Sequence, residues 1–316
     1  MMKGMVLSEF GDVSVFERQD LPKPEPDVGE LRVRVHATAV NPLDCRVRRE
    51  GASMGLSTPL VLGYDASGVV DAVGPGVEDF EVGDEVFYTS ELFEDGCYAE
   101  YNTVSEQIVA RKPENLTHAE AAALPVAAST GWAALIERGD LQLGERVLVH
   151  GVGGVGQQVV QIAAAAGAEV FASASPQTTD IAERLGADTV VDYRSGDFVE
   201  TVDEETDGEG VDLVVDTVGG GLLEQSIEAL ADHGRMVDIV GEPGDVGPTG
   251  KLANATVEFM ALMRTKETIT AVRRLALRKQ IVPVIDSEYP LEEVGAAHQA
   301  LEEGGITGKI VLQIHE

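Results

Sequence analysis

The chain has 316 residues, with 23 Lys+Arg against 55 Asp+Glu, which gives a formal net charge of −32. That length suits one large domain or two ordinary ones, since domains typically have roughly 100–200 residues. A hydrophobic content of 44% and a charged content of 25% exclude a disordered or collagen-like chain. No apolar run reaches the roughly 18–20 residues of a membrane span, and acidic residues stand where a secretory signal is apolar. We therefore expect a soluble, cytoplasmic protein without a membrane partner.

The cysteine count and the charge exclude further classes. Two cysteines, Cys45 and Cys97, cannot form a disulfide framework or a four-cysteine zinc lobe. Because an acidic surface repels phosphate backbones, we expect no nucleic-acid partner. The excess of acid also favours a halophilic protein, in which a salty cytoplasm screens the repulsion between carboxylates. An ordinary acidic enzyme is the alternative.

The first hundred residues predict short strands separated by glycine- and proline-containing turns. Residues 31–40 alternate in polarity, and further strand-like runs follow at 60–70 and 84–88. Many short strands with such turns are typical of a β-rich, barrel-like domain.

The pattern changes near residue 117. An alanine-rich helical stretch begins there, and Thr117 with Glu120 forms a plausible capping box. Apolar strand runs then alternate with helices, at 147–151, 169–173, 189–193, 212–217 and 235–240. Such alternation predicts a parallel sheet with right-handed crossovers. The late strands IVPVID and GKIVLQI could extend this sheet or return to the first domain, and periodicity does not decide between the two.

A glycine motif, GVGGVG at 151–156, follows a predicted strand and opens a predicted helix. In the G-x-G-x-x-G pattern, the first glycine makes the tight turn and the second lets the backbone approach a pyrophosphate. The third glycine allows the helix and strand to pack closely, and the helix N-terminus supplies N–H donors. The motif therefore predicts a dinucleotide site.

The end of the next strand predicts which dinucleotide binds. Ser173, Ala174 and Ser175 stand where NAD-binding proteins carry an acidic residue that binds the ribose. Hydroxyls and amides accept a 2′-phosphate, whereas a carboxylate would repel it, so NADPH is favoured over NADH. No Arg or Lys lies between Phe171 and Asp180 to neutralise that phosphate.

Together these segments resemble the medium-chain dehydrogenase/reductase superfamily, in its zinc-independent quinone and enone (alkenal) reductase branch. The similarity covers nearly the whole chain, and its segments occur in the family order: VNPLDCRVRREG, PLVLGYDASGVV, GPGVEDFEVGDEVF, GCYAEY, ALPVAASTGWAAL, VLVHGVGGVGQ, ERLGADTVVDY and TGKIVLQI. The sequence GYDASGVV is more similar to the enone reductases than to the alcohol dehydrogenases.

The resemblance implies an α/β protein with two domains. A GroES-like, β-rich catalytic domain would comprise residues 1–119 and 266–316, and a Rossmann domain with a doubly wound parallel sheet would comprise residues 120–265. NADPH and substrate would meet in a cleft. Relatives commonly form homodimers through the last strand of the Rossmann sheet, here near ATVEFMAL.

The family comparison also bears on metal binding and catalysis. Asn41 and the sequence Gly63-Tyr64-Asp65 occupy positions where zinc members carry a Cys and a Gly-His-Glu. Since a thiolate and an imidazole are both replaced, we expect no metal. The comparison places Asn41 beside the nicotinamide as a donor to a substrate oxygen, and Tyr64 is the candidate second donor or proton relay. Asp44 is expected to order the NPLD turn.

Several residues match family positions around NADPH. They lie near the phosphates, near the adenosine and along the nicotinamide, and they are Ser129, Thr130, Gly153, Gly154, Val155, Ser173, Tyr193, Thr217, Val240, Gly241 and Lys309. Thr178 falls where related quinone reductases carry a phosphate-binding lysine, which weakens the expected preference for NADPH.

The resemblance implies an NADPH-dependent oxidoreductase that transfers hydride to a quinone or to the β-carbon of an α,β-unsaturated carbonyl. Hydrogen-bond donors aimed at the carbonyl oxygen would stabilise the charge that develops there. The alternatives are an alcohol or sugar dehydrogenase of the same superfamily and a non-enzymatic cofactor-binding protein.

Overall fold

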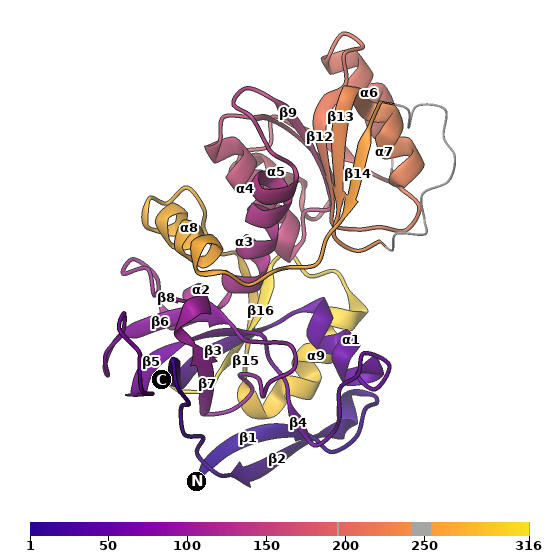
Figure 1. Ribbon diagram of the computed structural model, residues 1–316. Coiled ribbons are helices and arrows are strands. Elements are labelled where there is room, and N and C mark those ends of the chain that lie inside the picture. The colour runs from indigo at the N-terminus through magenta and orange to yellow at the C-terminus, as the bar shows by residue number, and fades with distance from the viewer. Residues whose placement is uncertain (195, 242–253, 316) are drawn as a thin grey trace. The chain divides into compact units, whose positions relative to one another are not determined.

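The computed structural model describes residues 1–194, 196–241 and 254–315, which form two compact units (Figure 1). The first unit consists of Met1–Val126, Arg264–Lys279 and Pro283–Glu316, and the second of Ala127–Met263 and Gln280–Val282. The boundaries expected from the sequence lie after residue 119 and before residue 266, so the first unit extends somewhat further at both breaks.

The first unit is built on two sheets. The seven-stranded sheet has the order β15 (Ile285–Pro290), β16 (Lys309–Gln313), β3 (Glu30–Val40), β5 (Asp65–Val73), β6 (Glu85–Thr89) and β8 (Val109–Arg111), with β7 (Tyr101–Ser105) also paired to β3. The three-stranded sheet has the order β2 (Phe16–Leu21), β1 (Met2–Leu7) and β4 (Leu60–Val61). The α-helices in the described residues of this unit are α1 (Pro42–Glu50), α2 (His118–Ala122), the start of α3 (Pro125–Trp132), α8 (Lys266–Leu277) and α9 (Val294–Glu303).

Alternation in β3 positions the core of this unit. Leu31, Val33, Val35, Ala37 and Ala39 are all fully buried, as expected when every second side chain of a strand points to the same face. The strands predicted at 31–40 and 84–88 are confirmed, whereas the run at 60–70 is divided between β4 and β5, which belong to different sheets.

The two C-terminal strands return to the first unit. β16 pairs antiparallel with β3, and β15 pairs parallel with β16. The predicted strand IVPVID is wrong in its first four residues, because β15 begins only at Ile285. Instead, the Val282 N–H donates to Gln161 Oε1 at 2.7 Å. The Val282 carbonyl accepts from the side-chain amides of Gln158 and Gln161, each at 3.1 Å.

In its described residues, the second unit contains a six-stranded parallel sheet. Its order is β11 (Thr189–Asp192), β10 (Glu169–Ala174), β9 (Arg146–His150), β12 (Val211–Asp216), β13 (Leu230–Asp238) and β14 (Thr256–Phe259). The connecting helices are α4 (Gly154–Ala165), α5 (Thr179–Leu185), α6 (Phe198–Glu205) and α7 (Leu223–Ala229). The order reverses at β9, so the sheet is doubly wound, as predicted, and the carboxyl ends of its strands meet at one edge.

The helical stretch predicted after residue 117 begins as expected but is divided. The Thr117 N–H donates to Glu120 Oε2 at 2.8 Å, and the Glu120 N–H donates to Thr117 Oγ1 at 3.2 Å, which is the predicted capping box. The helix ends at Ala122 because Pro125 has no N–H to continue it, and α3 begins at that proline.

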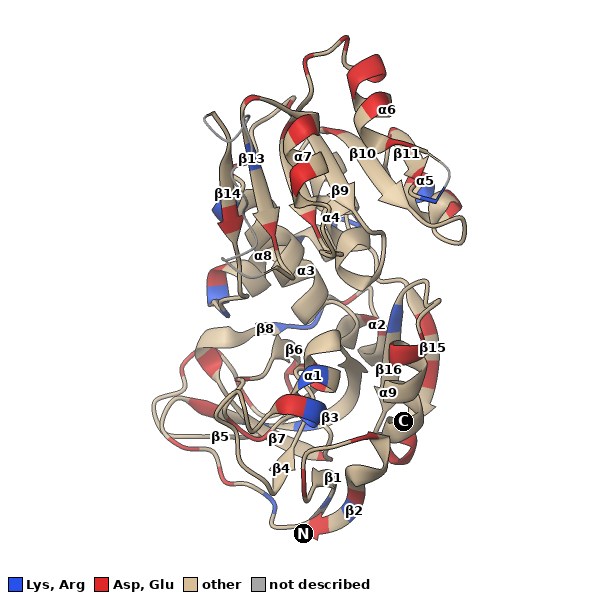
Figure 2. Cartoon of the chain, turned by 90° about the vertical axis from the view of Figure 1, so that its right-hand side faces the viewer, with Lys and Arg blue, Asp and Glu red and all other residues tan. Residues whose placement is uncertain are grey.

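Acidic side chains recur along the exposed elements of both units, and α6 and α7 carry several of them (Figure 2). Within the described ranges, no helix is both long and apolar enough to cross a bilayer.

Candidate active site

A tight glycine loop joins β9 to α4. Gly151 has a φ of 80°, a conformation that favours glycine. A Cβ added to Gly156 would lie 1.8 Å from the Gly151 carbonyl oxygen, so only glycine lets the helix pack this closely against the loop. A Cβ added to Gly153 would instead meet no atom within 4 Å. The chain itself therefore requires Gly151 and Gly156, whereas Gly153 borders open space.

That open space suits a pyrophosphate. Gly153 is the N-cap of α4, and Gly154 and Val155 form its first turn. Amides of a first turn have no partner within their helix and point, with the positive end of the helix dipole, toward an anion. The three residues that the sequence assigns to the pyrophosphate thus lie together, and they fit the phosphates of a dinucleotide.

Thr217, expected along the nicotinamide, has its hydroxyl engaged within the protein. Its Oγ1 donates to the His150 carbonyl at 2.7 Å and approaches the Gly151 carbonyl at 3.3 Å. The residue therefore fixes the glycine loop against the end of β12.

Two buried aspartates shape the neighbouring loops. Each lies at the end of a strand, and one of its oxygens accepts two backbone N–H groups at 2.7–2.9 Å: Asp216 from Val218 and Gly219, and Asp238 from Val240 and Gly241. Because these turns lie at the carboxyl edge of the sheet, Val240 and Gly241 are held where a dinucleotide binds in this fold.

At the end of β10, Ser173 is buried, and its carbonyl accepts the Gly151 N–H at 3.0 Å. The Ala174 carbonyl accepts the Tyr193 N–H at 3.1 Å, which brings exposed Tyr193 beside the same strand end. The guanidinium of Arg194 lies 5.5 Å from the Tyr193 ring centroid and donates to its hydroxyl at 3.3 Å. A cation therefore lies at this end of the sheet, although none lies in the segment after β10.

Ser129 and Thr130 lie on α3, and the side chains of both are buried. The structure thus places these two predicted phosphate-binding residues next to each other on one helix.

A buried cluster in the first unit surrounds Asn41, where β3 meets α1. Lys309, the first residue of β16, donates from Nζ to Asn41 Oδ1 and, at 3.1 Å, to Asp65 Oδ2. Asn41 Nδ2 donates to Asp65 Oδ2 at 2.9 Å and to the Ala39 carbonyl at 3.4 Å. The other Asp65 oxygen accepts the Val126 N–H at 2.7 Å.

This arrangement differs from the expected roles of two residues. Both amide hydrogens of Asn41 are already bonded, so its side chain orients Lys309 and Asp65 instead of presenting a free donor. Lys309, expected beside the cofactor, joins the Asn41 cluster. Its ammonium places a positive charge next to the positions that match the metal ligands of zinc relatives.

Asp44 and Tyr64 lie beside this cluster. Asp44 Oδ2 accepts the Asn41 N–H at 2.7 Å, so the residue orders the turn as the sequence predicts. Burial raises the pKa of the Asp44 carboxyl to about 7, and the nearby Asp65 adds to the rise. The Tyr64 side chain is 1% exposed, and its hydroxyl has no hydrogen-bond partner among the described residues. Burial raises the pKa of that hydroxyl, so Tyr64 remains a donor.

Both cysteines are packed inside the first unit. Burial raises the pKa of the Cys45 and Cys97 thiols to about 12, so neither is a reactive thiolate near neutral pH. In the part of the chain that the structure describes, no three His, Cys, Asp or Glu residues are grouped so that they could hold a metal ion.

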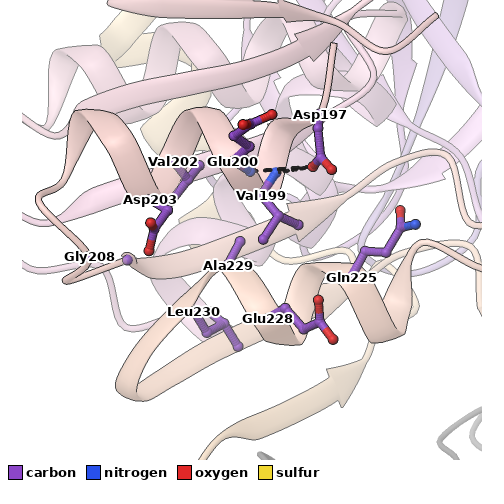
Figure 3. A pocket seen from close by; sticks show the side chains of 11 residues that line it. Asp197, Val199, Glu200, Val202, Asp203, Gly208, Gln225, Glu228, Ala229 and Leu230 are labelled. Carbon is purple, nitrogen blue, oxygen red and sulfur yellow. Dashed lines mark hydrogen bonds between the residues drawn. The ribbon is translucent and has the colours of Figure 1, made fainter.

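A groove of about 520 Å³ lies elsewhere, between α6 and α7 of the second unit (Figure 3). Four carboxylates line it, from Asp197, Glu200, Asp203 and Glu228. Asp197 is occupied in capping α6, since its Oδ1 accepts the Val199 N–H at 2.9 Å. Because carboxylates repel phosphates and none of the predicted site residues lines this groove, it does not suit the cofactor.

Sequence reasoning missed three contributors to these sites. Asp65 lies within the recognised GYDASG segment, but its bonds to Asn41 and Lys309 join parts of the chain that are far apart. Arg194 directly follows Tyr193, and that adjacency is the available signal for a cation at the adenosine end. Asp216 ends a predicted strand, as acidic capping residues of turns often do.

Comparison with known proteins agrees with this architecture. Residues 27–114 match the alcohol dehydrogenase GroES-like domain, and residues 185–312 match the zinc-binding dehydrogenase family. Human quinone oxidoreductase is 31% identical over 324 residues, which cover 99% of this chain and 98% of that protein. Phthioceranic/hydroxyphthioceranic acid synthase of Mycobacterium bovis is 34% identical over 319 residues. That match covers 96% of this chain, which spans only 15% of the length of the synthase.

Solved structures have the same fold over the whole chain. An NAD-dependent alcohol dehydrogenase has a TM-score of 0.92 at 35% identity, covering 99% of this chain and 100% of that one. A mycobacterial protein solved in complex with NADPH has a TM-score of 0.87 at 29% identity, covering 99% of this chain and 100% of that one. With its GroES-like and Rossmann units and its full-length similarity to quinone oxidoreductase, the chain belongs to the medium-chain dehydrogenase/reductase superfamily of oxidoreductases.

Proposed function

We propose that this oxidoreductase uses NADPH, without a metal, to reduce a quinone or the carbon–carbon double bond of an α,β-unsaturated carbonyl. The observation that carries the proposal is the buried Tyr64 hydroxyl, which has no partner among the described residues and lies beside the Lys309 cluster. An unpaired buried donor costs stability unless a ligand bonds to it. A carbonyl oxygen that gains negative charge is a suitable ligand.

Bound NADPH would supply the hydride. The chain's own part is to stabilise the charge that develops on the substrate oxygen, and Tyr64 is the proposed donor to that oxygen. Lys309 holds a positive charge near the reacting groups, and Asn41 and Asp65 fix its ammonium in place. We propose Asn41 as a positioning residue, because its amide hydrogens are bonded within the protein.

Asp44 is the candidate proton store. With a pKa of about 7, its carboxyl is partly protonated near neutral pH, and one of its oxygens is buried without a hydrogen-bond partner among the described residues. Such a group can give up a proton to reduced substrate and regain it from solvent.

The preference for NADPH rests on the ends of β10 and β11. Ser173 and Ser175 present no carboxylate to a 2′-phosphate, and Arg194 beside Tyr193 supplies the cation that the segment after β10 lacks. A guanidinium binds phosphate through charge-assisted hydrogen bonds. The remaining predicted contacts, from Ser129, Thr130 and the glycine loop, serve either cofactor.

Three further properties are proposed. β14 is the edge of its sheet in the described part of the second unit, and an unpaired edge suits pairing with a second copy. The excess of carboxylates supports a high-salt environment. A cytoplasmic location remains a prediction.

A turnover panel tests the proposal. Purified protein is mixed with NADPH or NADH and with quinones, enones and alcohols, with and without a chelator, while its zinc content is measured. We expect NADPH oxidation with quinones or enones, no loss with the chelator and no stoichiometric zinc. Chelator-sensitive alcohol oxidation with about one zinc per chain would instead identify an alcohol dehydrogenase. Cofactor binding without turnover of any substrate would support the non-enzymatic alternative.

A further inference from the structure

Arg264 lies between β14 and α8 and belongs to the first unit. Its guanidinium carbon is 5.9 Å from the centroid of the Tyr64 ring. Its Nε is buried and has no hydrogen-bond partner among the described residues, and no described carboxylate forms an ion pair with it. An arginine that is held partly inside the protein without an acidic partner is therefore located beside the proposed donor.

Several buried or partly buried arginines of this chain are paired with carboxylates, whereas Arg273 donates to the backbone carbonyl of Arg111 at 2.8 Å. Arg48 binds Glu302 through two bonds of 2.8 and 2.9 Å, and Arg235 donates to Glu145 at 2.5 Å. With 55 acidic residues against 23 basic ones, a partner would be easy to provide. Arg264 Nε instead has no hydrogen-bond partner among the described residues.

The nearby charges do not neutralise Arg264. Asp65 is already paired with Lys309 at 3.1 Å. Asp44, with a pKa of about 7, is largely uncharged at slightly acidic pH, and Glu91 attracts Arg264 without bonding to it. Burial lowers the pKa of the guanidinium, yet an arginine stays protonated in proteins. A positive charge therefore lies over the ring of Tyr64, whose hydroxyl has no hydrogen-bond partner among the described residues.

We propose that Arg264 and Tyr64 together bind the substrate oxygen on which negative charge develops, so that Arg264 is a catalytic residue. This inference rests on the reductase function proposed above. The β-carbon of an enone would gain a hydride from NADPH, which becomes NADP⁺. The C=C π pair then forms a double bond between the α-carbon and the carbonyl carbon, and the C=O π pair moves to the oxygen, which gives an enolate. The α-carbon then takes a proton from water or from a protonated side chain. A quinone gains the same hydride and becomes a hydroquinone after one proton is added.

A purely structural role for Arg264 makes a different prediction. If the guanidinium only stacks on the Tyr64 ring, its removal should lower the melting temperature and leave kcat nearly unchanged, since a cation–π contact stabilises the folded protein. A donor to the oxyanion acts mainly in the transition state, so its removal should lower kcat without weakening NADPH binding.

The experiment compares Arg264→Gln with Arg278→Gln. Arg278 is an exposed arginine that follows α8 in the same unit, so the control removes the same charge away from the site. We expect kcat to fall on the order of 10²-fold in Arg264→Gln, with an unchanged Kd for NADPH, and to stay at the parent value in Arg278→Gln. Arg264→Lys should recover part of the loss. Equal kcat in all three variants would overturn the inference.

A double variant tests whether the two donors share one oxygen. When Arg264→Gln and Tyr64→Phe are combined, the loss in kcat should be smaller than the product of the two single losses, because residues that act as a unit are not additive. Fully multiplicative losses would show that the two side chains act separately, which contradicts the proposal.

A binding probe separates this inference from the proposed function. 4-Nitrophenol has a coloured anion, and a site that stabilises an oxyanion should lower its apparent pKa when it binds in the presence of NADP⁺. We expect that shift in the parent and Arg278→Gln, and its loss in Arg264→Gln. Absence of the shift in the parent would overturn the inference. Absence of quinone and enone turnover, with the shift intact, would overturn only the proposed reductase function.

Discussion

Replacing Asp44 with asparagine is expected to make the stability of the protein less dependent on pH. Asp44 is fully buried, and burial raises the pKa of its carboxyl from 3.8 to about 7. The folded protein therefore holds a proton that the unfolded chain releases between these two values. The stability gained from this proton is complete below the unfolded pKa and is lost as pH rises through the folded one.

The size of the effect follows from the two pKa values. With about 7 in the folded protein and 3.8 in the unfolded chain, the protonated carboxyl adds about 2 kcal/mol at about pH 5.5 and almost nothing at about pH 8.5. Asparagine does not titrate, and its side-chain oxygen can still accept the Asn41 N–H. The free energy of unfolding of Asp44→Asn, measured relative to that of the parent, should therefore rise by about 2 kcal/mol from about pH 5.5 to about pH 8.5.

Urea unfolding followed by circular dichroism, at both pH values and one fixed high salt concentration, measures this difference. Asp197→Asn is the matched control, because Asp197 also accepts backbone N–H groups at a helix start but is exposed. We expect no comparable gain in the control. If the difference between Asp44→Asn and the parent is the same at both pH values, Asp44 is ionised throughout and cannot be the proton store.

Further outcomes follow from the cofactor unit and the surface. Gly153→Ala should fold like the parent but bind NADPH more weakly, since its Cβ enters the open space proposed for the pyrophosphate. Gly156→Ala should instead lower the melting temperature, because its Cβ would clash with the Gly151 carbonyl. Ser175→Asp should raise the Kd for NADPH relative to the Kd for NADH, because a carboxylate repels the 2′-phosphate. Ser175 is chosen instead of Ala174 because the Ala174 side chain is buried. Arg194→Gln should weaken NADPH binding and leave NADH binding unchanged; equal effects on both Kd values would contradict a 2′-phosphate contact. The melting temperature should rise from low to molar salt as repulsion between carboxylates is screened, and a flat profile would argue against the halophilic interpretation.

The sequence predicts the architecture well because the signals are local. Alternation from Leu31 to Ala39 specifies a strand with one buried face, and Thr117 with Glu120 specifies a helix start. The same local signals failed where long-range bonds decide the outcome. Ile281 to Val284 resemble a strand, but two glutamines from α4 take the backbone groups of Val282 that a strand would need.

The candidate site was only partly predictable for the same reason. The glycine loop is contiguous in sequence, so the roles of Gly151 and Gly156 follow from spacing alone. The bonds of Asn41 do not, since they depend on a carboxylate and an ammonium supplied by other strands. Arg264 carries no motif, and its significance lies in the absence of an acidic neighbour within bonding reach among the described residues.

The pairing of β16 with β3 has a consequence for the order in which the enzyme can become active. Asn41 and Lys309 are 268 residues apart, and the segment between them includes the whole of the second unit. During synthesis, the parallel sheet can be completed while β3 still lacks β16. The proposed catalytic cluster can form only after β16 has been synthesised. The reactive centre therefore stays incomplete while the second unit is being made, and loss of β16 would remove the Lys309 ammonium from a protein that still carries its glycine loop.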